Sequence, residues 1–169
     1  MKKVRRMIIG CLIFGVIILL FMPMPWLVIE DVKGGEKLRA IPLTWLDQFE
    51  ICYTHSVDQQ PVCEVFKVRW GKGIVLHEMY FRMFGAGMGH WKGHGDVVSE
   101  AGWIKIKKID KPIGSFLLRV GSRGVDHVLS VRGKKINLTE RAEGKLVELR
   151  IEIKPWVLAI IHIRAEGRS

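Results

Sequence analysis

The chain has 169 residues, 49% of them apolar, and a formal net charge of +10. This length suits a single domain and leaves little room for a second. Four positive charges, at Lys2, Lys3, Arg5 and Arg6, precede a long apolar run, and the others are mixed with acids along segments such as 145–154. Such mixing is typical of a solvated strand face, and no RNA- or DNA-binding motif is present, so we expect no nucleic-acid partner.

The N-terminal segment is predicted to anchor the chain in a membrane. Met7–Met22 is an uninterrupted apolar run, and the uncharged residues 23–29 extend it to a length within the ~17–25 residues that cross a bilayer as a helix. No small-residue cleavage site follows Met22, so we expect an uncleaved signal anchor. The basic flank should stay in the cytoplasm, which places the rest of the chain outside, with Trp26 at the outer membrane interface.

These features divide the chain into three parts. Residues 1–29 are predicted to be the cytoplasmic flank and the transmembrane anchor. Residues 30–36 include Lys33-Gly34-Gly35-Glu36 and read as a linker, since adjacent glycines favour a break in regular structure. Residues 37–169 are predicted to form one extracytoplasmic domain.

This domain is predicted to be all-β, a small antiparallel sandwich or barrel. Residues 49–88 contain three apolar-alternating runs separated by turn signals, which is typical of a three-stranded meander. Along the second run, 62–70, the even-numbered residues share one face. Further short strands are expected at 38–43, 103–107, 116–120, 127–132, 135–138 and 146–153, with one helical turn at 139–143.

The C-terminal run Trp156–Ile163 is apolar but too short to span a membrane as a helix. Its continuous apolarity predicts a central strand buried on both faces. A surface that docks on an integral membrane partner is the alternative interpretation.

Two of the three cysteines are predicted to face each other. If Ser56–Gln59 turn the first hairpin, Cys52 lies opposite Cys63, and directly opposed side chains approach to within disulfide reach. Outside the cytoplasm such a bond would persist. The alternative is a pair of unbonded, buried thiols.

A polar rim is the predicted binding site. His55 and Ser56 end the first strand of the meander, Glu64 lies on the neighbouring strand, and a glycine run follows the third strand. We expect His55 and Ser56 to offer polar contacts and Glu64 to hold His55 in place. Backbone N–H groups of the glycine run would receive a carboxylate or a partner loop. The predicted binding residues are His55, Ser56, Glu64, Gly85, Ala86 and Gly87.

Two kinds of catalytic site are possible alternatives. A hydrolase would use His55 as base, Ser56 as nucleophile and Glu64 as orienting acid, but adjacent strand residues point to opposite faces. A metal-dependent enzyme would use the imidazole and carboxylate groups of the glycine-rich loop. Its candidate ligands are His90, His94 and Asp96. The HxxxH spacing aligns two ligands reliably only on a helix, so we expect no metal and no cofactor.

Several of these residues together resemble a known family. They are Tyr-Thr-His-Ser-Val at 53–57, Pro61-Val62 and Glu64, Phe66, Glu78, and Gly-Ala-Gly-Met at 85–88. The pattern is similar to the domain-of-unknown-function family 1850, small prokaryotic proteins that often have one N-terminal membrane segment. Members are frequently encoded beside TAXI-type TRAP transporters, so the resemblance implies an association with transport.

We therefore expect a non-catalytic, membrane-anchored accessory protein of a solute transporter. Its partner would be a transporter membrane subunit or the solute-binding protein. A hydrolase or metal-dependent enzyme and an envelope structural module are the alternatives.

Overall fold

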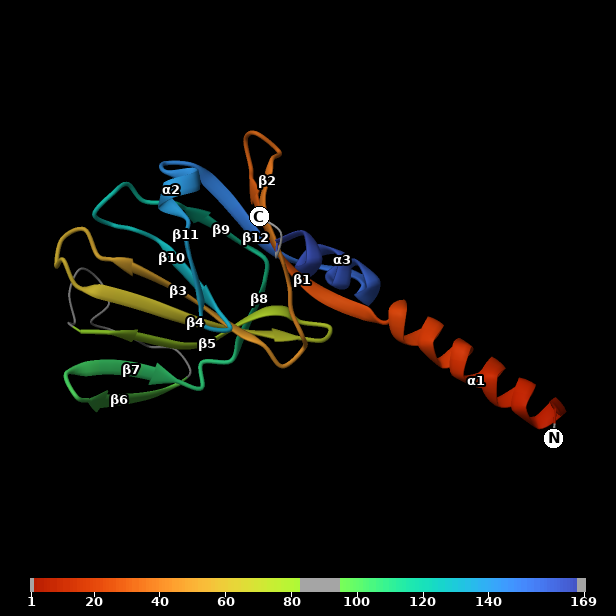
Figure 1. Cartoon of the computed structure of the whole chain (residues 1–169). Coiled ribbons are helices and arrows are strands. Elements are labelled where there is room, and N and C mark those ends of the chain that lie inside the picture. Colours follow the sequence, from red (N-terminus) through yellow and green to blue (C-terminus); the bar gives the residue numbers. More distant parts are fainter. Residues whose placement is uncertain (1, 83–94, 167–169) are drawn as a thin grey trace.

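The computed structural model describes residues 2–82 and 95–166. Figure 1 shows one helix, α1 (Lys2–Leu20), projecting from a body made of antiparallel β-sheets. A second helix, α3 (Trp156–Glu166), lies against the body close to the point where α1 joins it. The prediction of antiparallel β structure is confirmed in its coarser form, because the body is mostly β but also contains helices.

The smaller sheet has four strands in the order β2-β1-β12-β9. It joins the two ends of the chain, because β1 pairs with β12 along its whole length, from Pro23 opposite Pro155 to Asp31 opposite Val147. The strands are β1 (Pro23–Asp31), β2 (Lys37–Pro42), β9 (Phe116–Arg119) and β12 (Leu146–Pro155).

The larger sheet has eight strands, with the path β11-β10-β3-β4-β5-β7-β6 and β8 paired to β5. Its centre is the predicted meander of β3, β4 and β5. The strands are β3 (Gln48–Thr54), β4 (Pro61–Arg69), β5 (Gly73–Phe81), β6 (Asp96–Glu100), β7 (Trp103–Lys107), β8 (Lys111–Gly114), β10 (Val128–Val131) and β11 (Lys134–Asn137).

The two sheets share one hydrophobic core. Leu27 and Leu149 of the smaller sheet and Phe49 and Leu129 of the larger one belong to the same buried cluster. Phe66 on β4 stacks on Phe116 of β9 with the ring centroids 5.0 Å apart, which ties the sheets together through an aromatic pair. A second, smaller cluster of Val62, Phe81, Ile106 and Ile109 extends the core between β4, β5 and β7.

The predicted membrane helix is wrong in its second half. Pro23–Asp31 forms β1, in which Leu27, Val28 and Ile29 are fully buried. The physical reason is that Pro23 and Pro25 lack the backbone N–H that a helix needs. A strand also buries the apolar run between β2 and β12. Trp26 is therefore buried in the body and not at a membrane interface, and the expected linker shrinks to the turn between Asp31 and Lys37.

Neither α1 nor any other helix in the described part of the chain is both long enough and apolar enough to cross a membrane.

The predicted C-terminal strand is also wrong, because Trp156–Glu166 forms α3. β12 already occupies the central position of the smaller sheet, and its partner β1 begins at Pro23, opposite Pro155. The β1–β12 ladder ends at this pair, because α1 ends at Leu20, just before β1 begins, and from Trp156 onward a helix satisfies the backbone groups internally. The predicted helical turn at 139–143 is confirmed as α2 (Thr139–Ala142).

The hairpin register predicted from the sequence is confirmed. Cys52 lies directly opposite Cys63 in the β3–β4 ladder, and the two sulfur atoms form a disulfide. The third cysteine, Cys11, is free and exposed on α1.

Candidate functional site

Glu64 is an acid in an apolar row. The inward face of β4 carries Val62, Glu64, Phe66 and Val68, and the other three side chains are buried in the core. Across the sheet, Glu64 lies opposite Ile51 on β3 and Met79 on β5. Along β4 it separates Val62, which belongs to the smaller cluster, from Phe66, which belongs to the shared core.

The carboxyl group of Glu64 has no partner of its own within the described residues. It makes no hydrogen bond or ion pair there, and burial, which penalises the charged form, raises its pKa. An acid in such a place is destabilising unless a donor or a cation reaches it. Glu64 is therefore the residue of this sheet that most needs a ligand.

Tyr53 lies beside Glu64, and His127 lies beside Tyr53. Tyr53 is the diagonal neighbour of Glu64 on the same face, two residue pairs further along the ladder. Burial raises the pKa of Tyr53, and the negative charge of Glu64 adds to this rise. The Tyr53 ring stacks on that of His127, with a centroid separation of 5.0 Å and an interplanar angle of 18°.

The structure fixes the orientation of His127. Its side chain is 6% exposed, and its Nδ1 accepts the backbone N–H of Gly121 at 3.0 Å. Because Nδ1 is an acceptor, the neutral ring carries its proton on Nε2. Burial also lowers the pKa of His127, which favours this neutral form. We call Tyr53, Glu64 and His127 together the Glu64 site.

The rim residues His55 and Ser56 lie in the β3–β4 turn. His55 Nδ1 is 3.4 Å from a carboxylate oxygen of Asp58, and the Ser56 carbonyl accepts the side-chain amide of Gln59 at 2.8 Å. The expectation that Glu64 holds His55 is therefore wrong, because the nearer acid, Asp58, takes that role within a tight turn. In the described part of the chain, no hydrogen bond links the Ser56 hydroxyl to His55.

Several predicted site residues lie outside the described residues. These are Gly85, Ala86, Gly87, His90 and His94, so the predicted convergence of the glycine run with His55 stays a prediction. Asp96, the third candidate metal ligand, is described. It begins β6, is exposed, and forms an ion pair with Lys108 at 2.7 Å.

The outward face of the same sheet carries the disulfide. Glu50, Cys52 and Cys63 have their ligand atoms within 4.8 Å of one another. The two sulfur atoms are bonded to each other and so are not thiolate ligands, while Glu50 accepts the hydroxyl proton of Tyr80. This cluster stabilises the outward face and offers no metal site in its bonded form.

A second polar arrangement on this face was not predicted from the sequence. His77 Nε2 lies 2.6 Å from Lys67 Nζ, and His77 Nδ1 lies 2.6 Å from Asp110 Oδ1. The register shift of the β4–β5 ladder inserts His77, and Asp110 adopts a left-handed conformation with φ of 43°. Neither the bulge nor the turn has a residue pattern in the sequence that would have revealed the contact.

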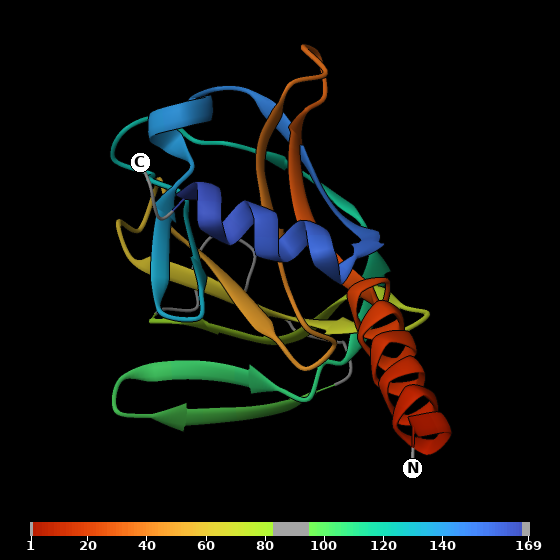
Figure 2. The same cartoon turned by 45° about the vertical axis from the view of Figure 1, so that its right-hand side comes forward.

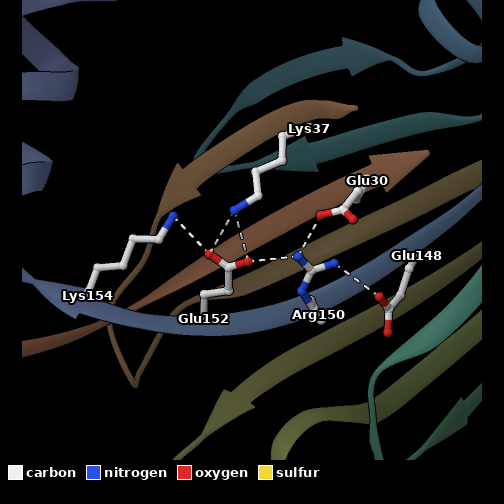
Figure 3. Close-up of polar contacts among 6 residues, drawn as sticks. All are labelled: Glu30, Lys37, Glu148, Arg150, Glu152 and Lys154. Carbon is white, nitrogen blue, oxygen red and sulfur yellow. Dashed lines mark hydrogen bonds and ion pairs between the residues drawn. The ribbon is translucent and has the colours of Figure 1, made fainter. Parts of the chain in front are cut away.

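The outward face of the smaller sheet holds a network of ion pairs, drawn in Figure 3. Arg150 on β12 bonds Glu30 at 2.6 Å, Glu152 at 2.8 Å and Glu148 at 3.0 Å. Lys37 and Lys154 complete the network on Glu152. Every carboxylate here is paired, in contrast to Glu64, so the network has a structural role.

Fold and site together describe a class: a small protein of two antiparallel sheets, with a helix at each end of the chain and an unpaired acid on the inward face of the larger sheet. The chain belongs to the family DUF1850, a domain of unknown function, whose model matches residues 49–138, more than half of the sequence. The matched segment contains all three residues of the Glu64 site. No curated protein and no solved structure matches the chain.

Proposed function

We propose that this protein is a non-catalytic accessory subunit of a solute transporter, held at the membrane by α1. It binds a basic side chain of a transporter membrane subunit, or of the solute-binding protein, through Glu64. The observation that carries the proposal is the half-buried Glu64 carboxyl group, which lacks a partner in the described residues. The link to transport rests on the resemblance to a family whose members are often encoded beside TAXI-type TRAP transporters.

The chemistry of Glu64 favours a cationic ligand. A lysine or arginine that reaches the carboxylate would cancel the cost of its burial and gain a charge-assisted hydrogen bond in a poorly solvated place. Removing one member of such a buried pair at an interface typically costs about 2–5 kcal/mol of binding free energy. The site is therefore suited to specific recognition of one residue on a partner.

The surface of α1 supports attachment to a membrane. The large apolar side chains from Met7 to Leu19 are between 44% and 66% exposed, whereas a helix that packs on a soluble body buries one face. Lys3, Arg5 and Arg6 are exposed at its beginning. The apolar part of α1, Met7–Leu20, is about 21 Å long at 1.5 Å per residue. Local thinning of the bilayer and extension of the basic side chains toward the headgroups would accommodate this short helix.

Co-purification tests the proposal directly. The full-length tagged protein is expressed together with the subunits of a TAXI-type TRAP transporter from the same source, solubilised in mild detergent and captured, and the bound subunits are identified. Glu64→Gln keeps the shape of the side chain and removes its charge. We expect wild type to retain a transporter subunit and Glu64→Gln to lose at least nine-tenths of it.

A matched control separates this effect from misfolding. Glu78→Gln removes a charge from the same sheet, at a position opposite Val65, and should leave capture unchanged. Equal capture by wild type and Glu64→Gln would contradict a role for Glu64. Absence of any transporter subunit with wild type would contradict the accessory function itself.

A further inference from the structure

The exposed face of α3 is apolar and continuous with the end of α1. Trp156, Leu158 and Ile161 of α3 are 40%, 41% and 59% exposed. The backbone N–H of Trp156 donates to the carbonyl of Met22 at 3.0 Å, so α3 begins where the chain leaves α1. Phe21 and Met22 are also exposed at this junction.

The opposite face of α3 is fixed to the body. Ala159 is buried against Trp26 and Val28 on the outward face of β1. The ring of His162 meets that of Trp26 edge to face, with the centroids 5.3 Å apart. Because one side of the helix is held by the sheet, the apolar side that remains is presented in a defined direction and is not a frayed end.

The exposed side of α3 faces the direction in which α1 projects. α1 points to the right in Figure 1, so it comes toward the viewer in Figure 2, where α3 crosses the front of the strands. The two helices therefore lie on the same side of the body in Figure 2.

We propose that α3 is an interfacial helix: Trp156, Leu158 and Ile161 lie at the boundary between headgroups and acyl chains of the bilayer that holds α1. This inference rests on the proposed membrane attachment of α1 and adds the orientation of the body. Trp156 at the junction and Lys154 just before it are the residue types that favour the headgroup region. From Trp156 to Ile163 the sequence contains no Asp, Glu, Lys or Arg, and its one histidine, His162, packs on Trp26, so this face lacks the charges that favour contact with water.

Lipid is favoured over a partner protein as the cover of α3, because the apolar surface of α3 adjoins that of α1. α1 exposes apolar side chains all around its axis, as a helix surrounded by lipid does, and α3 begins at Trp156, whose backbone N–H donates to the Met22 carbonyl just after α1. A helix with protein on one side and a monolayer on the other needs no polar face of its own.

Site-directed spin labelling of the full chain tests this inference. In a Cys11→Ser background that keeps the Cys52–Cys63 disulfide, single cysteines replace Ile161, Leu117 or Ile13, and each is labelled with a nitroxide. Leu117 on β9 is a matched control because it is 60% exposed, almost the same as Ile161. The proteins are reconstituted into phosphatidylethanolamine–phosphatidylglycerol vesicles, and collision with oxygen is compared with collision with a water-soluble nickel chelate.

We expect the ratio of oxygen to nickel accessibility to be at least threefold higher at 161 than at 117, and highest at 13. If the ratio at position 161 equals that at 117 while the label at 13 is in lipid, the interfacial helix is refuted and the membrane anchor is retained. If the label at position 13 is in water, the anchor proposal fails and this inference fails with it. A label at 161 shielded from both reagents would show a second copy over α3 and would also refute it. Should Ile161→Cys misfold, a label at Leu158 gives the same comparison.

Discussion

The two sheets of this protein differ in how they are assembled and in what they carry. The eight-stranded sheet lies between Gln48 and Asn137 and includes the hairpins β3–β4, β4–β5, β6–β7 and β10–β11, and it carries the disulfide and Glu64. The four-stranded sheet pairs β1 with β12 from opposite ends of the chain. The helices α1 and α3 attach to these two strands. The family match, 49–138, covers the larger sheet except for Gln48 and only β9 of the smaller one.

This difference teaches that attachment and recognition are divided between the sheets. In the smaller sheet, the outward carboxylates of Glu30, Glu148 and Glu152 are all paired with Arg150, as suits a scaffold. The larger sheet leaves one inward acid unpaired within the described residues, as suits a binding element. The strands that hold the helices and the strand that holds Glu64 can therefore be perturbed separately.

The largest effect is expected from β1. Leu27→Ala removes a fully buried side chain from the core shared by both sheets and should lower the free energy of unfolding by about 2–5 kcal/mol. Leu46→Ala, at a position 85% exposed, should change it by less than about 0.5 kcal/mol. Denaturant unfolding of the detergent-solubilised chain, followed by tryptophan fluorescence, measures both. Equal small losses would mean that β1 is not a core strand.

β1 and α3 are also where prediction from the sequence failed, and for one reason. Both are apolar runs without a clear period, and such a run is consistent with a membrane helix, a buried strand or a packed helix. Pro23 and Pro25 indicate the end of α1, but only pairing with β12, more than a hundred residues away, shows that the run becomes a strand. The same pairing ends at Pro155, and the helix α3 begins at the next residue, Trp156.

The β3–β4–β5 meander of the larger sheet could be predicted because its information is local. Alternation along β3, β4 and β5 and the turn residues between them specify the register, and the register alone brings Cys52 opposite Cys63. The candidate site was found only in part. Alternation identifies Glu64 as an acid on an apolar face, whereas the stacking of His127 on Tyr53 depends on β10 lying beside β3.

The disulfide gives the next largest effect and tests the larger sheet alone. Replacing Cys52 and Cys63 together by serine should lower the free energy of unfolding by about 2–4 kcal/mol, because the unfolded chain regains the freedom that the cross-link removes. Cys11→Ser, on exposed α1, should leave stability unchanged. Denaturant unfolding with and without a phosphine reductant measures the contribution of the disulfide to the free energy of unfolding. A wild-type chain whose stability does not change on reduction would contradict a stabilising bond.

A smaller, pH-dependent effect is expected in the smaller sheet. Hydrogen bonds from Lys154, Arg150 and Lys37 lower the pKa of Glu152 to about 2, from an ordinary 4.5. Because this carboxyl loses its proton more readily in the folded state, its contribution is complete above about pH 4.5 and is lost as the pH falls toward 2. Solvent screening limits this contribution to about 1 kcal/mol. Glu152→Gln should flatten the stability profile between pH 5 and 2, whereas the exposed Glu36→Gln should preserve its slope.

The smallest effect on stability is expected at Glu64. Its charge should destabilise the fold, whereas the charge of Glu152 stabilises it. Burial raises the pKa of Glu64, so the folded state holds this proton more tightly than the unfolded state does. The charge therefore destabilises the fold progressively as the pH rises from the unfolded value through the folded one. Glu64→Gln should give a modest gain in stability at pH 7 that disappears near pH 4, measured by the same unfolding experiment. A gain in stability together with the loss of partner capture would identify Glu64 as a residue retained for binding at the expense of the fold, whereas a loss of stability at pH 7 would show that its charge is satisfied within the chain.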